Sequence, residues 1–241
     1  MRIAIISDIH GNLEALDQVL ADIDSRHIDK IIDLGDNIGY GPDPEQVMDQ
    51  ILDRKIPSIL GNHELALMEP ELLGWFNPAA KESLIRTREM LSADSLTFIE
   101  TMEKSMVMHN CRFVHGFPPD SVTTYLFEVD QEKLERTFNA SMDRLCFTGH
   151  THRLEAVGSN GETTSRHPLH RGIFRIDPAK KYIFNVGSVG QPRDGDNRAK
   201  YVILDDTART LEARFVPYDI VITAKKIIAA GLPRMHADRL W

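Results

Sequence analysis

Residues 3–12 read Ile-Ala-Ile-Ile-Ser-Asp-Ile-His-Gly-Asn, and this stretch decides the fold. Its first four residues form an uninterrupted apolar run, which is typical of a strand buried on both faces of a sheet. The run ends at Ser7 and Asp8, and Asn12 is a suitable N-cap for a helix over residues 13–23, where apolar positions recur at helical spacing. The stretch therefore predicts a buried strand that ends in polar residues and leads into a helix.

The same pattern returns twice along the first quarter of the chain. Strands are predicted at residues 30–34 and 56–60, and they end at Gly35-Asp36 and Gly61-Asn62-His63. A helix beginning at Pro44 is predicted between them. This β-α-β-α-β alternation predicts a largely parallel sheet with right-handed crossovers.

Beyond this point the pattern changes twice. Residues from about 64 to 104 are predicted to be helical without a strand, which makes them an insert or cap rather than another βα unit. The remainder is rich in predicted strands, with one helix at 131–138 and a last helix at about 219–231, which Gly231-Leu232-Pro233 ends. The predicted strands lie at 105–108, 111–114, 145–147, 156–157, 172–176, 182–186, 201–204 and 211–216. Two sheets packed face to face, with helices outside, accommodate both halves in one domain spanning residues 1–241.

Composition excludes several classes of protein. The 241 residues include 28 Lys and Arg against 36 Asp and Glu, a formal charge of −8, so non-specific binding to duplex nucleic acid or anionic membranes is disfavoured. The longest apolar runs, such as residues 3–6 and 201–204, are far below the ~18 residues of a membrane span, and the N-terminus lacks a signal-peptide pattern. Cys111 and Cys146 make neither a CxxC pair nor a disulfide framework, so a cytoplasmic location is expected.

Polar side chains that bind metals well follow five of the predicted strands. They are Asp8, His10, Asp36, Asn62, His63, His115, His150 and His152. In an open sheet the ligand crevice lies beyond the carboxyl ends of the strands. Alternate residues along a strand point the same way, so Asp8 with His10, and His150 with His152, are each expected to face one ion. Each residue alone also has an ordinary interpretation as a turn or cap, but their recurrence at five strand ends favours a site.

The other histidines are interpreted as surface or core residues. They are His27, His109, His167, His170 and His236.

The type of ligand narrows the choice of metal. Oxygen and nitrogen donors without a thiolate indicate Mn, Fe, Zn, Co or Ni, and several imidazoles argue against a purely Mg²⁺ site. These candidate ligands are too many for one tetrahedral ion. They suit two ions that share a carboxylate, and the positive charge left over would attract a phosphate group.

Five short motifs together resemble a known family. In order, they are Asp8-Ile9-His10, Gly35-Asp36-Asn37, Gly61-Asn62-His63-Glu64, Val114-His115-Gly116 and Gly149-His150-Thr151-His152. This ordered set resembles the motifs of the calcineurin-like metallophosphoesterase superfamily over residues 3 to about 192. Residues 185–193, Asn-Val-Gly-Ser-Val-Gly-Gln-Pro-Arg, resemble a segment of its small bacterial phosphoesterase branch.

The resemblance implies an α/β fold, a four-layer αββα sandwich of two mixed sheets flanked by helices, around two divalent transition-metal ions, with Mn favoured. It implies that the first ion is held by Asp8, His10 and His152, and the second by Asn62, His115 and His150, with Asp36 bridging both. His63 matches the family's catalytic histidine, which is not a ligand. The family usually has Asp at the next position, so Glu64 leaves the role of that carboxylate open.

The function implied is metal-dependent hydrolysis of a phosphate ester, with hydroxide attacking phosphorus in line and His63 assisting the leaving group. The substrate would be a small phosphorylated molecule or nucleotide, and diesters and monoesters remain open, as do a protein phosphatase and a dinucleoside polyphosphate hydrolase. The alternative class is a non-catalytic scaffold with the same fold. The cysteine-phosphatase pattern is absent, because six residues instead of five separate Cys146 and Arg153. Oligomeric state is not predicted.

Three further features have two interpretations each. Arg193 would bind a substrate phosphate or pair with Asp194 or Asp196. The loop at 39–44, with Tyr40, would line the crevice or form a plain strand–helix turn. Trp75 and Phe76 would form a lid or pack the insert onto the sandwich, and packing is favoured.

Overall fold

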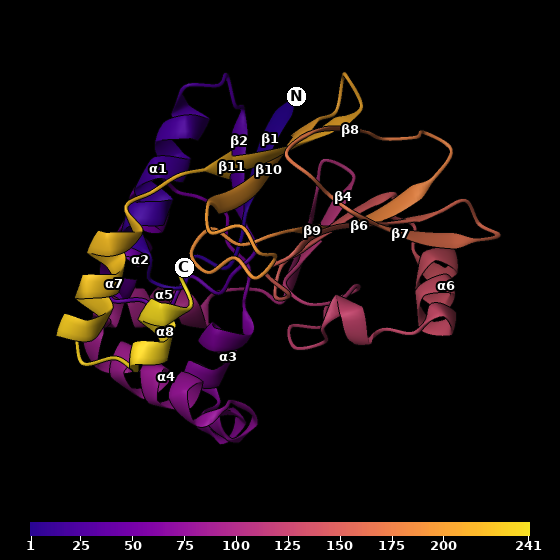
Figure 1. Ribbon diagram of the computed structural model, residues 1–241. Helices are drawn as coiled ribbons and strands as arrows, with labels where there is room; N and C mark the ends of the chain where they lie inside the picture. Colours follow the sequence, from indigo (N-terminus) through magenta and orange to yellow (C-terminus); the bar gives the residue numbers. More distant parts are fainter.

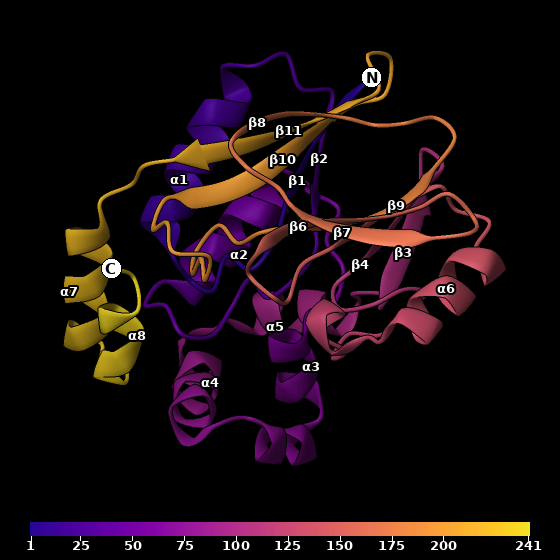
Figure 2. The same ribbon diagram turned by 45° about the vertical axis from the view of Figure 1, so that its right-hand side comes forward.

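Two β-sheets pack face to face with helices on their outer sides, as Figures 1 and 2 show for the computed structural model, which describes residues 1–241. The layers run from α1, α2 and α7, through the two sheets, to α6 (Figure 1). Helices α3, α4 and α5 gather at one end of the sandwich (Figure 2). The predicted α/β sandwich of two mixed sheets with outer helices is therefore confirmed.

The first sheet has five strands in the order β2-β1-β10-β11-β8. They are β1 (Arg2–Ile6), β2 (Lys30–Asp33), β8 (Gly172–Arg175), β10 (Ala199–Asp205) and β11 (Thr210–Val216). Only β1 and β2 run parallel, and the other neighbours are antiparallel.

The second sheet has six strands in the order β3-β4-β5-β9-β6-β7. They are β3 (Ser105–Met108), β4 (Cys111–Val114), β5 (Leu145–Thr148), β6 (Leu154–Ser159), β7 (Thr164–Pro168) and β9 (Lys181–Val186). Its centre, β4-β5-β9, is parallel, and the other pairs are antiparallel.

Eight α-helices and two short 3₁₀ segments connect the strands. The helices are α1 (Leu13–Asp24), α2 (Pro44–Asp53), α3 (Asn62–Met68), α4 (Pro78–Met90), α5 (Ala93–Glu100), α6 (Gln131–Ala140), α7 (Ile220–Ala229) and α8 (Arg234–Asp238). The 3₁₀ segments are Pro70–Trp75 and Leu126–Glu128. None of the helices combines the length and the apolar character that a bilayer crossing requires.

The apolar run at the N-terminus explains how the layers are held together. Ile3 and Ile5 belong to the cluster between the two sheets, where they join Phe113, Phe147 and other buried residues. Ala4 and Ile6 alternate with them and pack against the helix side of the first sheet. Because both faces of β1 are buried, its sequence is apolar without interruption.

The predicted third strand at 56–60 is wrong. That segment makes a single parallel bridge, between Asp33 and Ser58, before the chain enters α3. The expectation of a largely parallel first sheet is also wrong. One edge of β1 pairs with β2, and its other edge pairs antiparallel with β10, a strand far along the chain.

The helical region that begins near residue 64 contains α3, the 3₁₀ segment 70–75, α4 and α5, as expected. Asn77 caps α4, because its side chain accepts a hydrogen bond from the Ala80 N–H at 3.0 Å. Strand β7 and helix α8 were not predicted. The β7 residues Thr164–Pro168 are mostly exposed and lack apolar alternation, and α8 is only five residues long.

Candidate metal centre

The loops that follow β1 and β5 carry the first group of site residues. These strands end at Ile6 and Thr148, so strand alternation does not align the side chains that follow. Asp8 and His10 do face one candidate ion position, as expected, whereas His150 and His152 belong to different groups, contrary to the expectation. Instead, the backbone at Asp8, His10, His150 and His152 is left-handed, with φ of 54°, 51°, 65° and 59°. Non-glycine residues rarely adopt this conformation, which makes these loops a strained and specific feature of the chain.

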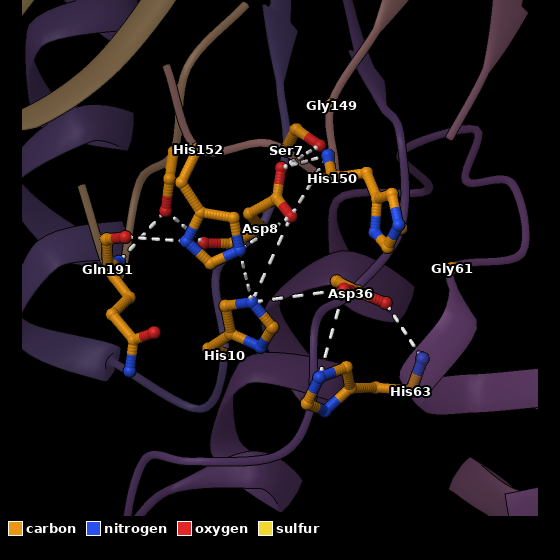
Figure 3. A network of polar contacts seen from close by, with 12 residues as sticks. Ser7, Asp8, His10, Asp36, Gly61, His63, Gly149, His150, His152 and Gln191 are labelled. Atoms are coloured by element: carbon orange, nitrogen blue, oxygen red, sulfur yellow. Dashed lines mark hydrogen bonds and ion pairs between the residues drawn. The ribbon is translucent and has the colours of Figure 1, made fainter. Parts of the chain in front are cut away.

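One group of side chains surrounds Asp8. Its Oδ1 lies 3.2 Å from Nε2 of His152 and 3.9 Å from Nε2 of His10, and the two imidazole nitrogens are 3.1 Å apart (Figure 3). The Asp8 carboxylate also accepts the backbone N–H of His150, with 3.0 Å to Oδ2. All four residues are buried. Asp8, His10 and His152 are thus close enough to share one ion.

A second group surrounds Asp36. Its Oδ2 lies 3.2 Å from Nε2 of His115 and 3.8 Å from Nε2 of His10, so Asp36 reaches both groups. The His115 Nε2 is also 3.2 Å from Oδ1 of Asn62, and the rings of His115 and His150 are 5.0 Å apart. Asp36, His115 and His150 can share a second ion. All seven predicted ligands therefore meet at one place.

Backbone carbonyls fix the tautomers of the histidines. In three rings Nδ1 donates a hydrogen bond to a backbone carbonyl. The pairs are His10 with Ile38 (3.0 Å), His115 with Leu34 (2.8 Å) and His152 with Gln191 (2.5 Å). Each of these rings therefore turns Nε2 toward the cluster, which is how metal-binding histidines are commonly oriented. In His150 it is Nε2 that lies 3.1 Å from the Thr123 carbonyl, so Nδ1 remains for the cluster.

The electrostatics of the cluster favour a bound cation. Burial alone would raise the pKa of Asp8 and Asp36, but neighbouring histidines outweigh it and hold both values below the usual range. Burial lowers the pKa of His10, and lowers that of His150 to about 3. Burial also opposes charge on His115, but the Asp36 carboxylate raises its pKa to about 10. The site thus offers ionised carboxylates and, at His10 and His150, neutral imidazoles, and His115 carries a proton that a metal ion would displace.

His63 lies beside this cluster, between two aromatic rings. Its ring centroid is 4.6 Å from Tyr40 and 5.1 Å from Phe76, and its Nε2 is 4.0 Å from Oδ2 of Asp36. Burial lowers the pKa of His63 to about 4, although Asp36 acts in the opposite direction. A Cβ at Gly39, where φ is +80°, would overlap the imidazole, so glycine there makes room for His63.

Glu64 has a role that the sequence left open. Its carboxylate accepts the backbone N–H groups of Asp36 (2.9 Å), Asn37 (2.7 Å) and Gly61 (3.2 Å), and it has no hydrogen bond to the His63 side chain. The residue is completely buried. Glu64 therefore fixes the loop that carries Asp36 instead of orienting His63.

Replacing Glu64 by alanine should destabilise the protein by about 2–4 kcal/mol, because three buried N–H groups would lose their acceptor. Urea denaturation measures this change. Glu69→Ala, at an exposed position just after the same helix, is the matched control and should stay close to wild type. A Glu64→Ala midpoint equal to that of the control would contradict this role.

A cavity of about 210 Å³ opens beside the cluster. Besides site residues, it is lined by Tyr40, Leu72, Trp75, Phe76, Asn77, Thr123, Tyr125, Arg193 and Arg239. Tyr40 thus does line the crevice. It also has a left-handed backbone, with φ of 63°, and its ring packs 4.5 Å from that of His10.

Arg193 points into this cavity and makes neither of the ion pairs considered for it. Asp194 pairs with Lys200 at 2.7 Å, and Asp196 pairs with Arg198. The Arg193 guanidinium instead donates to Oε1 of Gln191 at 2.9 Å and lies 6.0 Å from the Tyr40 ring centroid.

The packing interpretation holds for Phe76 and fails for Trp75. Phe76 packs against the core cluster of the helical region, whereas Trp75 is 71% exposed at the cavity. Sequence reasoning missed Arg239 altogether, because an arginine near the C-terminus carries no motif that would signal a site.

The five remaining histidines lie outside the cluster. His27, His109, His167 and His170 are exposed. His236 is buried, and its Nε2 donates to the carbonyl of Ala79 at 3.2 Å, as expected of a core histidine. The two cysteines are free and buried.

A sandwich of two mixed sheets with a buried cluster of histidines and carboxylates beyond its strand ends defines a metallophosphoesterase fold. The sequence profile of the calcineurin-like phosphoesterase superfamily domain matches residues 1–209, and the chain belongs to this superfamily.

Three similar proteins match nearly the whole chain. The uncharacterized protein MJ0912 of Methanocaldococcus jannaschii is 36% identical over 244 residues, covering 99% of this chain and 97% of the relative. The crystal structure of a metallophosphoesterase from Sphaerobacter thermophilus is 34% identical, with a TM-score of 0.84 over 100% of this chain and 98% of the other. The hypothetical protein PH1004 from Pyrococcus horikoshii OT3 shares the fold at 18% identity, with a TM-score of 0.79 over 100% and 97% of the two chains.

Proposed function

We propose that this protein hydrolyses phosphate esters at a dinuclear metal centre. The observation that carries the proposal is the meeting of seven oxygen and nitrogen donors around Asp8 and around Asp36. A third group, of His10, Asp36 and His63, lies between these two. Three imidazoles in this set have Nδ1 bound to a backbone carbonyl, so Nε2 faces the cluster as a ligand would. Such a set fits divalent transition metals, and Mn is our preferred candidate.

The two ions would be divided between the two groups. Asp8, His10 and His152 would hold the first ion. Asn62, His115 and His150 would hold the second, and Asp36 would bridge them. When bound, two divalent ions supply a hydroxide nucleophile at neutral pH and neutralise charge on the phosphoryl oxygens.

The chain's own side chains would complete the reaction. Arg193, at the wall of the cavity, would hold phosphoryl oxygens through its guanidinium. His63 would donate a proton from Nε2 to the departing oxygen, since that nitrogen faces Asp36 and the cluster. Its pKa of about 4 leaves the ring neutral at pH 7 before substrate arrives, and the negative charge of a phosphate beside it would favour protonation.

We also propose that residues 1–241 act as one domain. The helical insert at about 64–104 would be a cap over the cavity, and the C-terminal helix predicted at about 219–231 would belong to the same domain. Leu72, Trp75, Phe76 and Asn77 of the insert line the cavity, which supports this view.

A small phosphorylated molecule or nucleotide is the proposed substrate. Two free, buried cysteines are consistent with a cytoplasmic location.

Removing and restoring the metal tests the proposed activity. Protein stripped with a chelator should not hydrolyse bis-p-nitrophenyl phosphate or p-nitrophenyl phosphate, and reloading with Mn²⁺ should restore p-nitrophenol release. The expected ratio of rates with and without metal is at least about 10³. The ratio between the two substrates then distinguishes diesterase from monoesterase activity.

Two outcomes would contradict the proposal in different ways. Failure to bind any divalent metal, measured by elemental analysis after dialysis, would contradict the dinuclear centre itself. Two tightly bound ions without turnover of either ester would instead favour a non-catalytic scaffold.

A further inference from the structure

We propose that the cavity selects esters whose leaving group combines a flat aromatic ring with a further negative charge, as in a nucleotide. Trp75 would stack on the ring and Arg239 would hold the charge. This inference rests on the proposed hydrolysis, because it concerns the part of the substrate that departs.

The walls of the cavity next to His63 are aromatic. The ring of Phe76 meets that of His63 edge-on, with centroids 5.1 Å apart. Trp75 directly precedes Phe76 in the sequence and is more exposed. If His63 protonates the leaving oxygen, the leaving group must extend toward Phe76 and Trp75. Tyr125 faces the same cavity and stacks on His150 at 3.8 Å.

Packing in the hydrophobic core does not account for Trp75. Its side chain belongs to none of the apolar clusters and is 71% exposed, although its neighbours Leu72 and Phe76 pack against the helical core. A large exposed aromatic ring at the mouth of a polar site is typical of a binding platform, and every nucleobase has a face that can stack on it.

Arg239 brings a free positive charge to the same cavity. Its guanidinium makes no ion pair or hydrogen bond, although acidic residues outnumber basic ones in this chain. Helix α8, which precedes it, is anchored beside the insert: the His236 ring lies 4.8 Å from Tyr40, and its Nε2 donates to the Ala79 carbonyl. An exposed cation carried by an anchored segment, beside aromatic walls, fits a substrate that is both flat and anionic.

The position of Arg239 in the sequence is informative. The superfamily profile ends at residue 209, so α7, α8 and Arg239 are additions beyond the region that it describes. The metal cluster and His63 lie within the matched region. Arg239 lines the cavity and the added segment supplies none of the candidate metal ligands, which fits a part in the choice of substrate.

Binding to metal-free protein tests the proposal without turnover. In a Trp241→Phe background, Trp75 is the only tryptophan, so its fluorescence can be followed with excitation at about 295 nm. Four probes vary the aromatic ring and the second negative charge independently. They are adenosine 3′,5′-bisphosphate, adenosine 5′-monophosphate, fructose 1,6-bisphosphate and glycerol 3-phosphate. We expect quenching by the two adenosine compounds only, and roughly tenfold tighter binding of the bisphosphate than of the monophosphate.

Variants separate the two contributions. Arg239→Ala should remove most of the advantage of the bisphosphate. Arg234→Ala, at an exposed arginine of the preceding helix α8 that pairs with Asp238, should retain it. In Mn²⁺-loaded enzyme, Trp75→Ala should reduce the ratio of kcat/KM between adenosine monophosphate and glycerol phosphate by roughly tenfold. Trp241→Phe, which changes the other exposed tryptophan, should keep that ratio.

The possible results distinguish this inference from the proposed function. Equal binding of all four probes, or no quenching of Trp75, would overturn the inference even if esters are hydrolysed in the presence of metal. Quenching by the adenosine compounds without hydrolysis of any ester would support the pocket and contradict the proposed function.

Discussion

Asp36→Asn should reduce kcat/KM for p-nitrophenyl esters by roughly 10³-fold, equivalent to about 4 kcal/mol of transition-state stabilisation. Asp36 is the one carboxylate that lies within 4 Å of His10, His63 and His115, so it connects both proposed ion positions. The amide removes its charge but can still accept the His63 backbone N–H, which Oδ1 binds at 2.9 Å. Loss of activity would thus reflect the missing charge rather than a collapsed loop.

The same variant should bind fewer ions. We expect the metal content to fall from two ions per chain to one or none, measured by elemental analysis on protein reloaded with Mn²⁺. Asp33→Asn is the matched control, because Asp33 is equally buried but its carboxylate binds Asn37 and the Gly35 N–H instead of the cluster. An Asp36→Asn enzyme with two ions and wild-type turnover would refute the bridging role.

His63→Asn should retain both ions and lose roughly 10²–10⁴-fold in kcat. No hydrogen bond joins the His63 ring to another residue, and its Nε2 is 4.0 Å from Asp36 Oδ2, so its removal should leave the cluster intact. The loss should be largest for alkyl phosphates, whose leaving oxygens need a proton. It should be smallest for dinitrophenyl phosphate, whose leaving group departs without one.

The leaving-group series makes this assignment testable independently of rate alone. A loss of equal size for alkyl and dinitrophenyl esters would show that His63 acts on the phosphoryl group instead of on the leaving oxygen. His170→Asn, at an exposed histidine remote from the cluster, serves as the control for the substitution itself.

The sequence predicted the site more completely than the sheet that supports it. Asp8, His10 and the other candidate ligands follow apolar runs, a local signal that survives whichever strands later become neighbours. Strand pairing is not local: β10 lies about two hundred residues from β1 and takes the place next to it that a parallel neighbour would have had. Residues 56–60 have the composition of a strand, yet they pair only at Ser58.

The features that sequence reasoning missed share a physical cause. Arg239 lines the cavity because of where the chain places it, and its neighbours in the sequence give no periodic or motif signal. Trp75 was named as a lid or packing residue, but the sequence favoured packing, and only the tertiary structure shows it exposed at the cavity. The role of Glu64 depends on a side-chain length that reaches three backbone N–H groups of two different loops. Such contacts are set by the tertiary structure and follow from no local pattern.

At the candidate metal centre, the residues with a left-handed backbone lower the stability of the fold at the same positions that the proposed activity requires. Each such non-glycine residue costs on the order of 1 kcal/mol or more, and six of them belong to the centre or contact it. Their sum is comparable with the net stability of an ordinary domain. Selection for a more stable protein would therefore favour glycine at these six positions, five of which carry the Asp and His side chains of the proposed chemistry and one of which is Tyr40. Thermostable redesigns of this chain should therefore exclude them.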